Sequence, residues 1–139
     1  MKIEQIYTGC LAEAAYYIES NGEAAIIDPL REVEPYLKKA AQANTKIKYI
    51  FETHFHADFV SGHIDLAEKS GAQIVYGPTA VTTFPSHIAK DGEEFKIGDL
   101  TITALHTPGH TLESTTYLLT DKNGVKYCIF TGDTLFIGD

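Results

Sequence analysis

The stretch KYIFETHFHAD, residues 48–58, joins a predicted strand to a group of polar side chains. Residues 47–52 are β-branched and aromatic, which favours a buried strand. Alternate residues of an extended chain point to the same side, so His54, His56 and Asp58 can face one spot. Two imidazoles and a carboxylate on one side of a strand end suit a metal ion better than they suit packing. We therefore predict a metal site at this strand end.

Two more predicted strands, at residues 100–106 and 126–130, end in the same manner. The first leads into TPGH, which ends at His110, and the second leads into TGDT, which contains Asp133. In both motifs a glycine precedes the candidate ligand, and glycine lets the backbone turn sharply and approach another group. Ligand-binding residues gather at the carboxyl ends of neighbouring strands in open α/β sheets. The three motifs together predict one shared site.

The rest of the chain predicts a single α/β domain over residues 1–139 with a mixed sheet. SNG at residues 20–22 and KNG at 122–124 predict β-hairpins, and the segment 79–94 predicts no regular structure. Further strands are expected at residues 2–7, 14–19, 23–28, 72–76, 95–97 and 115–119, and helices at 33–43 and at 60–70, the latter ended by Gly71.

The charge balance argues against two classes of partner. The chain has 11 basic and 19 acidic residues, a formal net charge of −8. No local cluster of basic residues stands out, so neither nucleic acid nor an anionic membrane is an expected partner. With 44% hydrophobic and 22% charged residues, the composition excludes a disordered chain.

Cysteine usage and the N-terminus favour a cytoplasmic location. Cys10 and Cys128 form no CxxC pair and lie in apolar, strand-like surroundings, which predicts buried and unreactive thiols. The N-terminus MKIEQIYTGC lacks a signal-peptide pattern, and no segment approaches the ~18 apolar residues of a membrane span. His63, His87 and His106 are expected to be structural residues.

The sequence also excludes two classes of enzyme. It contains neither a GxSxG nucleophile elbow nor a glycine-rich phosphate loop. Serine hydrolases and nucleotide-binding proteins are therefore not expected.

THFHAD, followed by TPGHT and TGDT, resembles the metallo-β-lactamase superfamily. The flanking stretches FETH, VSGH and TGDTLFIGD resemble its persulfide dioxygenase (sulfur dioxygenase) branch, whose nearest relative is glyoxalase II. The resemblance extends over the whole chain but covers only the N-terminal part of the family domain. It implies an incomplete αββα sandwich that is truncated after the TGDT motif.

The resemblance implies a mononuclear iron site. In persulfide dioxygenases, residues at the positions of His54, His110 and Asp133 bind one Fe(II). Two imidazoles and one carboxylate are also the ligand set of non-haem iron oxygenases, which leaves three positions open. His56 and Asp58 would then orient the ligands or metal-bound water through hydrogen bonds. Zinc remains an alternative, because it would fit equally well if three histidines bound the metal.

Phe59 departs from the superfamily pattern. Family members that bind two metals have a histidine at this position, and it helps the preceding aspartate hold the second ion. Phenylalanine offers no lone pair, so Asp58 with a share of Asp133 should hold a second divalent ion poorly. This departure disfavours a binuclear hydrolase.

The predicted activity is an iron-dependent persulfide dioxygenase that oxidises a glutathione-type persulfide with O2 to sulfite and thiol. One alternative is a thioester hydrolase of the glyoxalase II type, that is, a hydroxyacylglutathione hydrolase. A second alternative is an inactive metal-binding fragment or interaction module. The resemblance also implies a homodimer, and a rhodanese-like domain in a longer parent protein.

Overall fold

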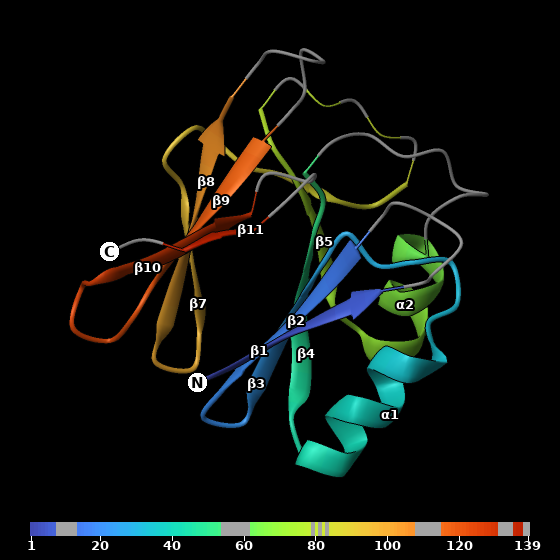
Figure 1. Cartoon of the computed structure of the whole chain (residues 1–139). Coiled ribbons are helices and arrows are strands. Elements are labelled where there is room, and N and C mark those ends of the chain that lie inside the picture. Colours follow the sequence, from blue (N-terminus) through green and yellow to red (C-terminus); the bar gives the residue numbers. More distant parts are fainter. Residues whose placement is uncertain are drawn as a thin grey trace.

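The computed structural model of the chain describes residues 1–7, 14–53, 62–78, 80, 82, 84–107, 115–130 and 135–137. Within these residues, two β-sheets pack face to face, and two helices cover the outer face of the first sheet (Figure 1). This arrangement confirms the expected fold class and gives three layers of an αββα sandwich.

The first sheet is mixed, as predicted. Its strands lie in the order β1-β2-β3-β4-β5-β6, antiparallel from β1 to β3 and parallel from β3 to β6. The strands are β1 (Lys2–Tyr7), β2 (Ala14–Ser20), β3 (Glu23–Ile27), β4 (Lys46–Phe51), β5 (Gln73–Tyr76) and β6 (His87–Ile88). The short β6 lies in the segment 79–94, for which the sequence predicts no regular structure. That prediction is wrong at His87 and Ile88, and also at Glu94, where the next strand begins.

The predicted hairpin between β2 and β3 is confirmed. Asn21 and Gly22 both have positive φ, 50° and 83°. Two successive residues with positive φ match the twist of the flanking strands, which is why Asn-Gly is favoured there.

Helices α1 (Glu34–Ala43) and α2 (His63–Ser70) connect β3 to β4 and β4 to β5. Each therefore completes a β-α-β unit, the connection that parallel strands require. Gly71 ends α2 with a left-handed conformation, as predicted. Helix α2 begins at His63, whereas the sequence predicts a start at residue 60. Gly62 caps the helix and does not itself have a helical conformation. A Cβ on Gly62 would lie 2.3 Å from the carbonyl oxygen of Leu30, so only glycine fits.

The second sheet is antiparallel, in the order β11-β10-β9-β8-β7. The predicted hairpin between β9 and β10 is confirmed, whereas β11 is not among the predicted strands. The elements are β7 (Glu94–Ile97), β8 (Leu100–His106), β9 (Thr115–Thr120), β10 (Lys126–Phe130) and β11 (Leu135–Ile137).

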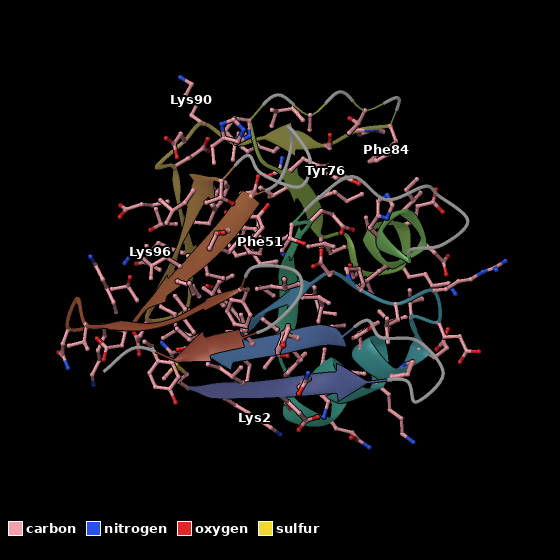
Figure 2. The ribbon with its side chains drawn as sticks, turned by 45° about the horizontal axis from the view of Figure 1, so that its top comes forward. Lys2, Phe51, Tyr76, Phe84, Lys90 and Lys96 are labelled. Carbon is pink, nitrogen blue, oxygen red and sulfur yellow. The ribbon has the colours of Figure 1, made fainter. Side chains whose placement is uncertain are left out.

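Two hydrophobic cores hold the layers together. The inner core lies between the sheets, and the outer core lies between the first sheet and the helices. Phe51 of β4 points into the inner core, where its ring centroid lies 5.3 Å from that of Phe95 and 5.0 Å from that of Tyr117 (Figure 2). In the described part of the chain, neither helix is long and apolar enough to cross a lipid bilayer.

Candidate metal centre

The predicted site residues lie outside the described part of the chain. They are His54, His56, Asp58, His110 and Asp133, and Phe59 lies outside it as well. The structure does describe the residues that flank these motifs. The geometry of the flanking residues establishes where the chain enters and leaves each motif.

The flanking residues of the three motifs meet at one end of the sandwich. Thr53, the first residue of THFHAD, accepts a 2.7 Å hydrogen bond at its carbonyl oxygen from the amide of Thr115, which follows TPGHT. Thr115 pairs with His106 at the end of β8, and Phe130, which precedes the third motif, pairs with Tyr117. The carboxyl ends of β4, β8 and β10 are therefore neighbours, as the sequence predicts for a shared site.

Tyr117 links the two sheets by hydrogen bonds next to this junction. Its buried hydroxyl donates to the carbonyl oxygen of Glu52 at 2.7 Å and lies 3.4 Å from that of Val75. Burial, with the nearby Asp28 and Glu52 carboxylates, raises the pKa of Tyr117 well above its ordinary value. The hydroxyl thus remains a hydrogen-bond donor throughout the neutral range.

Asp28 anchors the start of the first motif, a role that the sequence did not reveal. Its carboxylate accepts two hydrogen bonds from Thr53, at 2.9 Å from the amide and 2.6 Å from the hydroxyl. The sequence predicts Asp28 as the last residue of a strand, whereas its φ of 51° places it in a left-handed turn after β3. Aspartate tolerates this conformation better than most residues, and the Asp-Pro pair at 28–29 was the available signal.

Glu52 and His63 form a buried pair at the same strand end. Both side chains are fully buried, and Glu52 Oε1 lies 3.4 Å from His63 Nδ1. The His63 ring packs against Tyr76 and Phe84, with His63 Nε2 3.5 Å from the Tyr76 hydroxyl. The prediction that His63 is a packed residue agrees with this environment, but its acidic partner was not foreseen.

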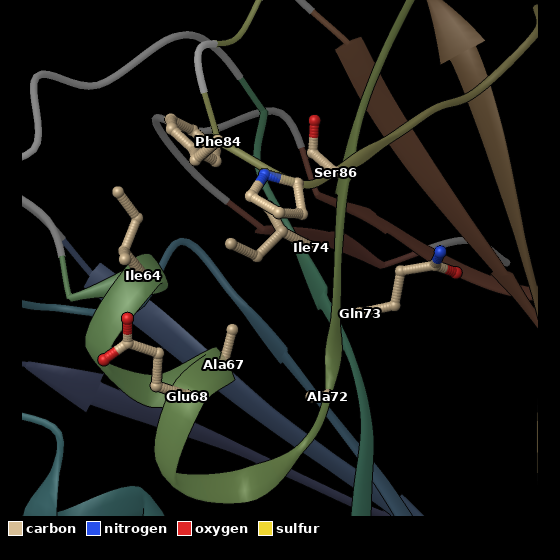
Figure 3. A pocket seen from close by; sticks show the side chains of 9 residues that line it. Ile64, Ala67, Glu68, Ala72, Gln73, Ile74, Phe84 and Ser86 are labelled. Carbon is tan, nitrogen blue, oxygen red and sulfur yellow. The ribbon is translucent and has the colours of Figure 1, made fainter.

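An apolar groove of about 530 Å³ lies between α2 and β5 (Figure 3). Ile64 and Ala67 form one wall, while Ile74, Phe84 and Pro85 form the other. Among the described residues, no three His, Cys, Asp or Glu side chains come together in a way that could hold a metal ion, here or elsewhere. The described residues of the groove therefore supply no metal site.

The prediction of a buried thiol is confirmed at Cys128. Cys128 lies in the inner core at 2% exposure, and burial raises the pKa of its thiol to about 11. A thiol with a raised pKa is mostly protonated near neutral pH, which makes it a weak nucleophile. Cys10 lies outside the described residues.

The chain belongs to the metallo-β-lactamase superfamily, whose family model matches residues 8–139. It is 34% identical over 142 residues to a cytoplasmic hydroxyacylglutathione hydrolase of Arabidopsis thaliana, covering 99% of this chain and 54% of the relative. A probable hydroxyacylglutathione hydrolase of Schizosaccharomyces pombe is 39% identical, over 81% of this chain and 44% of the relative. The chain therefore spans about half the length of the curated relatives it matches.

Two solved structures resemble this chain both in fold and in sequence. A metallo-β-lactamase from Staphylococcus aureus COL superposes with a TM-score of 0.84 at 35% identity, over 94% of this chain and 43% of the other. ETHE1 from Myxococcus xanthus superposes with a TM-score of 0.77 at 30% identity, over 86% of this chain and 54% of the other. These similarities confirm the family resemblance that the three motifs indicate.

Proposed function

We propose that this protein acts on the sulfur of a glutathione-type substrate with one metal ion held by His54, His110 and Asp133. The donor set supports the proposal, because two imidazoles and a carboxylate suit Fe(II) and also accept zinc. The junction of Thr53 with Thr115 supports it as well, because the chain enters or leaves all three motifs near that point.

The protein's own residues would position the substrate and the ligands. His56 and Asp58 would orient the ligand imidazoles or bound water by hydrogen bonds, which raises the basicity of the ligands and fixes their direction. Asp28 holds Thr53 through two hydrogen bonds, and Thr53 directly precedes His54. When bound, iron would supply open coordination positions and the redox chemistry that dioxygen requires.

The reaction that we propose is persulfide dioxygenation. A glutathione persulfide, one O2 and one water would give glutathione, sulfite and two protons; the outer sulfur is oxidised, O2 is reduced and the sulfur–sulfur bond breaks. Phe59 carries this choice, because it removes a ligand that a second metal would need. The similarity to ETHE1 of Myxococcus xanthus carries less weight, because this chain covers only 54% of that structure.

Thioester hydrolysis is the second candidate, and the names of the curated relatives favour it over the dioxygenase. In this reaction water would cleave an S-(hydroxyacyl)glutathione into glutathione and a hydroxy acid. We place it second because those names describe whole proteins of about twice the matched length, whereas Phe59 is a residue of this chain.

Parallel assays on one preparation separate the two reactions. O2 uptake is measured with glutathione persulfide, and thioester loss is measured with lactoylglutathione, both after loading with Fe(II) or Zn(II). The proposal predicts O2 uptake with Fe(II) and little thioester loss with either metal. Fast thioester cleavage without O2 consumption would establish the hydrolase. Metal binding with turnover of neither substrate would establish the inactive metal-binding module.

Three further predictions belong to the proposal. A homodimer and a rhodanese-like domain in a longer parent protein follow from the resemblance to persulfide dioxygenases. A cytoplasmic location follows from the cysteine usage, and one relative carries that location in its name.

A further inference from the structure

We propose that Glu52 and His63 are positioning residues that fix the two ends of the segment carrying His54, His56 and Asp58. The role that we assign to the pair rests on the proposed metal site. The contacts that support this role are all between residues that the structure describes. Glu52 lies just before the segment 54–61, and His63 lies just after it.

The pair joins the two ends directly. Glu52 follows the last residue of β4, and His63 is the first residue of α2. With Glu52 Oε1 3.4 Å from His63 Nδ1, the chain returns to its starting point after ten intervening residues. A contact between two fully buried side chains leaves little freedom in the separation of these ends.

A second set of contacts ties both ends to one stretch of chain after β3. Thr53 is held by the Asp28 carboxylate at the first end. At the second end, the amide of Gly62 lies 3.5 Å from the carbonyl oxygen of Pro29, and Gly62 packs against Leu30. The two ends of the segment are therefore joined to each other by the Glu52–His63 pair, and both are also joined to residues 28–30. We call this set of contacts the frame.

The chemistry of the pair favours a role in placement over a role in stability. Two buried ionisable groups lose their hydration, and an apolar pair of similar volume often stabilises a protein as well or better. The contact of 3.4 Å meets the distance for an ion pair but is not a directed hydrogen bond, so it would act through close packing and charge, which leave two fully buried groups few relative positions. Tyr76 and Phe84 wall off the His63 ring, which strengthens the interaction with Glu52 by excluding water.

The inference predicts that the pair governs metal affinity without contacting the metal. Ligands on a segment with fixed ends meet the ion at a lower entropic cost than ligands on a loose segment. Partners that orient metal ligands typically change affinity by about 10–100-fold when removed. We expect a change near the lower end of that range, because the pair acts through the backbone.

The test compares Glu52→Gln, His63→Gln and the double variant with the parent protein. Tyr17→Phe is the matched control, because it removes a buried hydroxyl that hydrogen-bonds to Thr45 at 2.9 Å, away from this frame. Hydrogen exchange of residues 53–62 is measured in metal-free protein, and Co²⁺ affinity and visible absorption are measured in the loaded protein. Urea unfolding gives the stability of each variant.

We expect the two single variants to raise exchange across residues 53–62 and weaken Co²⁺ binding on the order of ten-fold, with an altered Co²⁺ spectrum. The double variant should be little worse than either, because the two side chains act as one unit. Tyr17→Phe should lower stability without changing exchange in residues 53–62 or Co²⁺ binding. If the single variants exchange at the parental rate in this segment, or keep the parental Co²⁺ affinity and spectrum, the inference is wrong and the pair has a purely structural role.

Two outcomes separate this inference from the proposed function. If the parent protein binds no Co²⁺, the metal site fails, and the exchange data on metal-free protein still decide whether the pair fixes the segment. If the glutamine variants do not fold, Tyr76→Phe serves instead, since it removes the hydroxyl 3.5 Å from His63 Nε2. Unchanged exchange of residues 53–62 in Tyr76→Phe would then count against the inference.

Discussion

The amide of Thr115 donates a 2.7 Å hydrogen bond to the carbonyl oxygen of Thr53, and this bond joins the two sheets. Thr53 follows β4 of the first sheet, and Thr115 begins β9 of the second. Two sheets that meet through their backbones at this end hold the flanks of the three motifs in a fixed relation. Ligand residues carried by separate strands can share one ion only if their strand ends are held together in this way.

Tyr117→Phe should weaken the junction. The substitution takes the buried hydroxyl away from the carbonyl oxygens of Glu52 and Val75, and removing the partner of a buried acceptor costs about 1–3 kcal/mol. We expect the free energy of unfolding, measured in urea, to fall by about that amount. Tyr127→Phe is the control, because Tyr127 is 39% exposed and should tolerate the change. Equal stabilities of the two variants would contradict this role of Tyr117.

Asp133→Ala should remove most of the bound metal. The proposed site loses its only carboxylate ligand, and two imidazoles alone hold Fe(II) weakly. Metal content per chain is measured by elemental analysis after purification with a reductant. Asp99→Ala, a change at an exposed residue outside the motifs, controls for loss of one acidic group. An unchanged metal content in Asp133→Ala would disprove the ligand assignment.

Glu23→Gln should change how the free energy of unfolding depends on pH in the acidic range. The Glu23 carboxylate accepts a 2.7 Å hydrogen bond from the amide of Gly98, which with Lys48 holds its pKa below the ordinary value of 4.5. A lowered pKa means that the stabilisation is present above pH 4.5 and is lost as the pH falls through the folded-state pKa. The variant should be less stable at neutral pH but lose less stability on acidification. Urea unfolding from neutral pH to below pH 4.5 measures this dependence of stability on pH. Glu32→Gln, at an exposed residue, should show the same dependence as the parent protein.

Cys128 should make the protein less stable in alkali. Burial raises the pKa of its thiol from 9.0 to about 11, so the unfolded chain loses this proton first as the pH rises. The stabilisation is therefore complete below pH 9 and declines as the pH rises towards 11. In a Cys10→Ser background, a thiol reagent near neutral pH should label Cys128 only as fast as the protein unfolds. Rapid labelling of the folded protein would show that the thiol is accessible.

Local signals in the sequence predicted most of the elements correctly. Asn21 and Gly22 demand a tight turn, Gly71 ends a helix, apolar residues alternate along most of β8, and β10 is a short apolar run. Each of these features depends on neighbouring residues only. The amino-acid sequence alone therefore sufficed to place the strand ends that precede the three motifs.

Features that depend on distant partners were missed. The three-residue β11 exists because it pairs with β10, and β6 exists because it pairs with β5. The roles of Asp28 and Glu52 likewise arise from contacts with Thr53 and His63. Nothing in the local sequence distinguishes these acidic residues from exposed ones. The predicted ligands themselves lie outside the described residues, so their assignment stays a prediction.

The decisive measurement is the metal content per chain of freshly purified protein kept under reductant. We expect about one iron per chain, because Phe59 leaves the second metal position without a ligand that it needs. Two equivalents of zinc per chain would contradict it and would establish a binuclear centre.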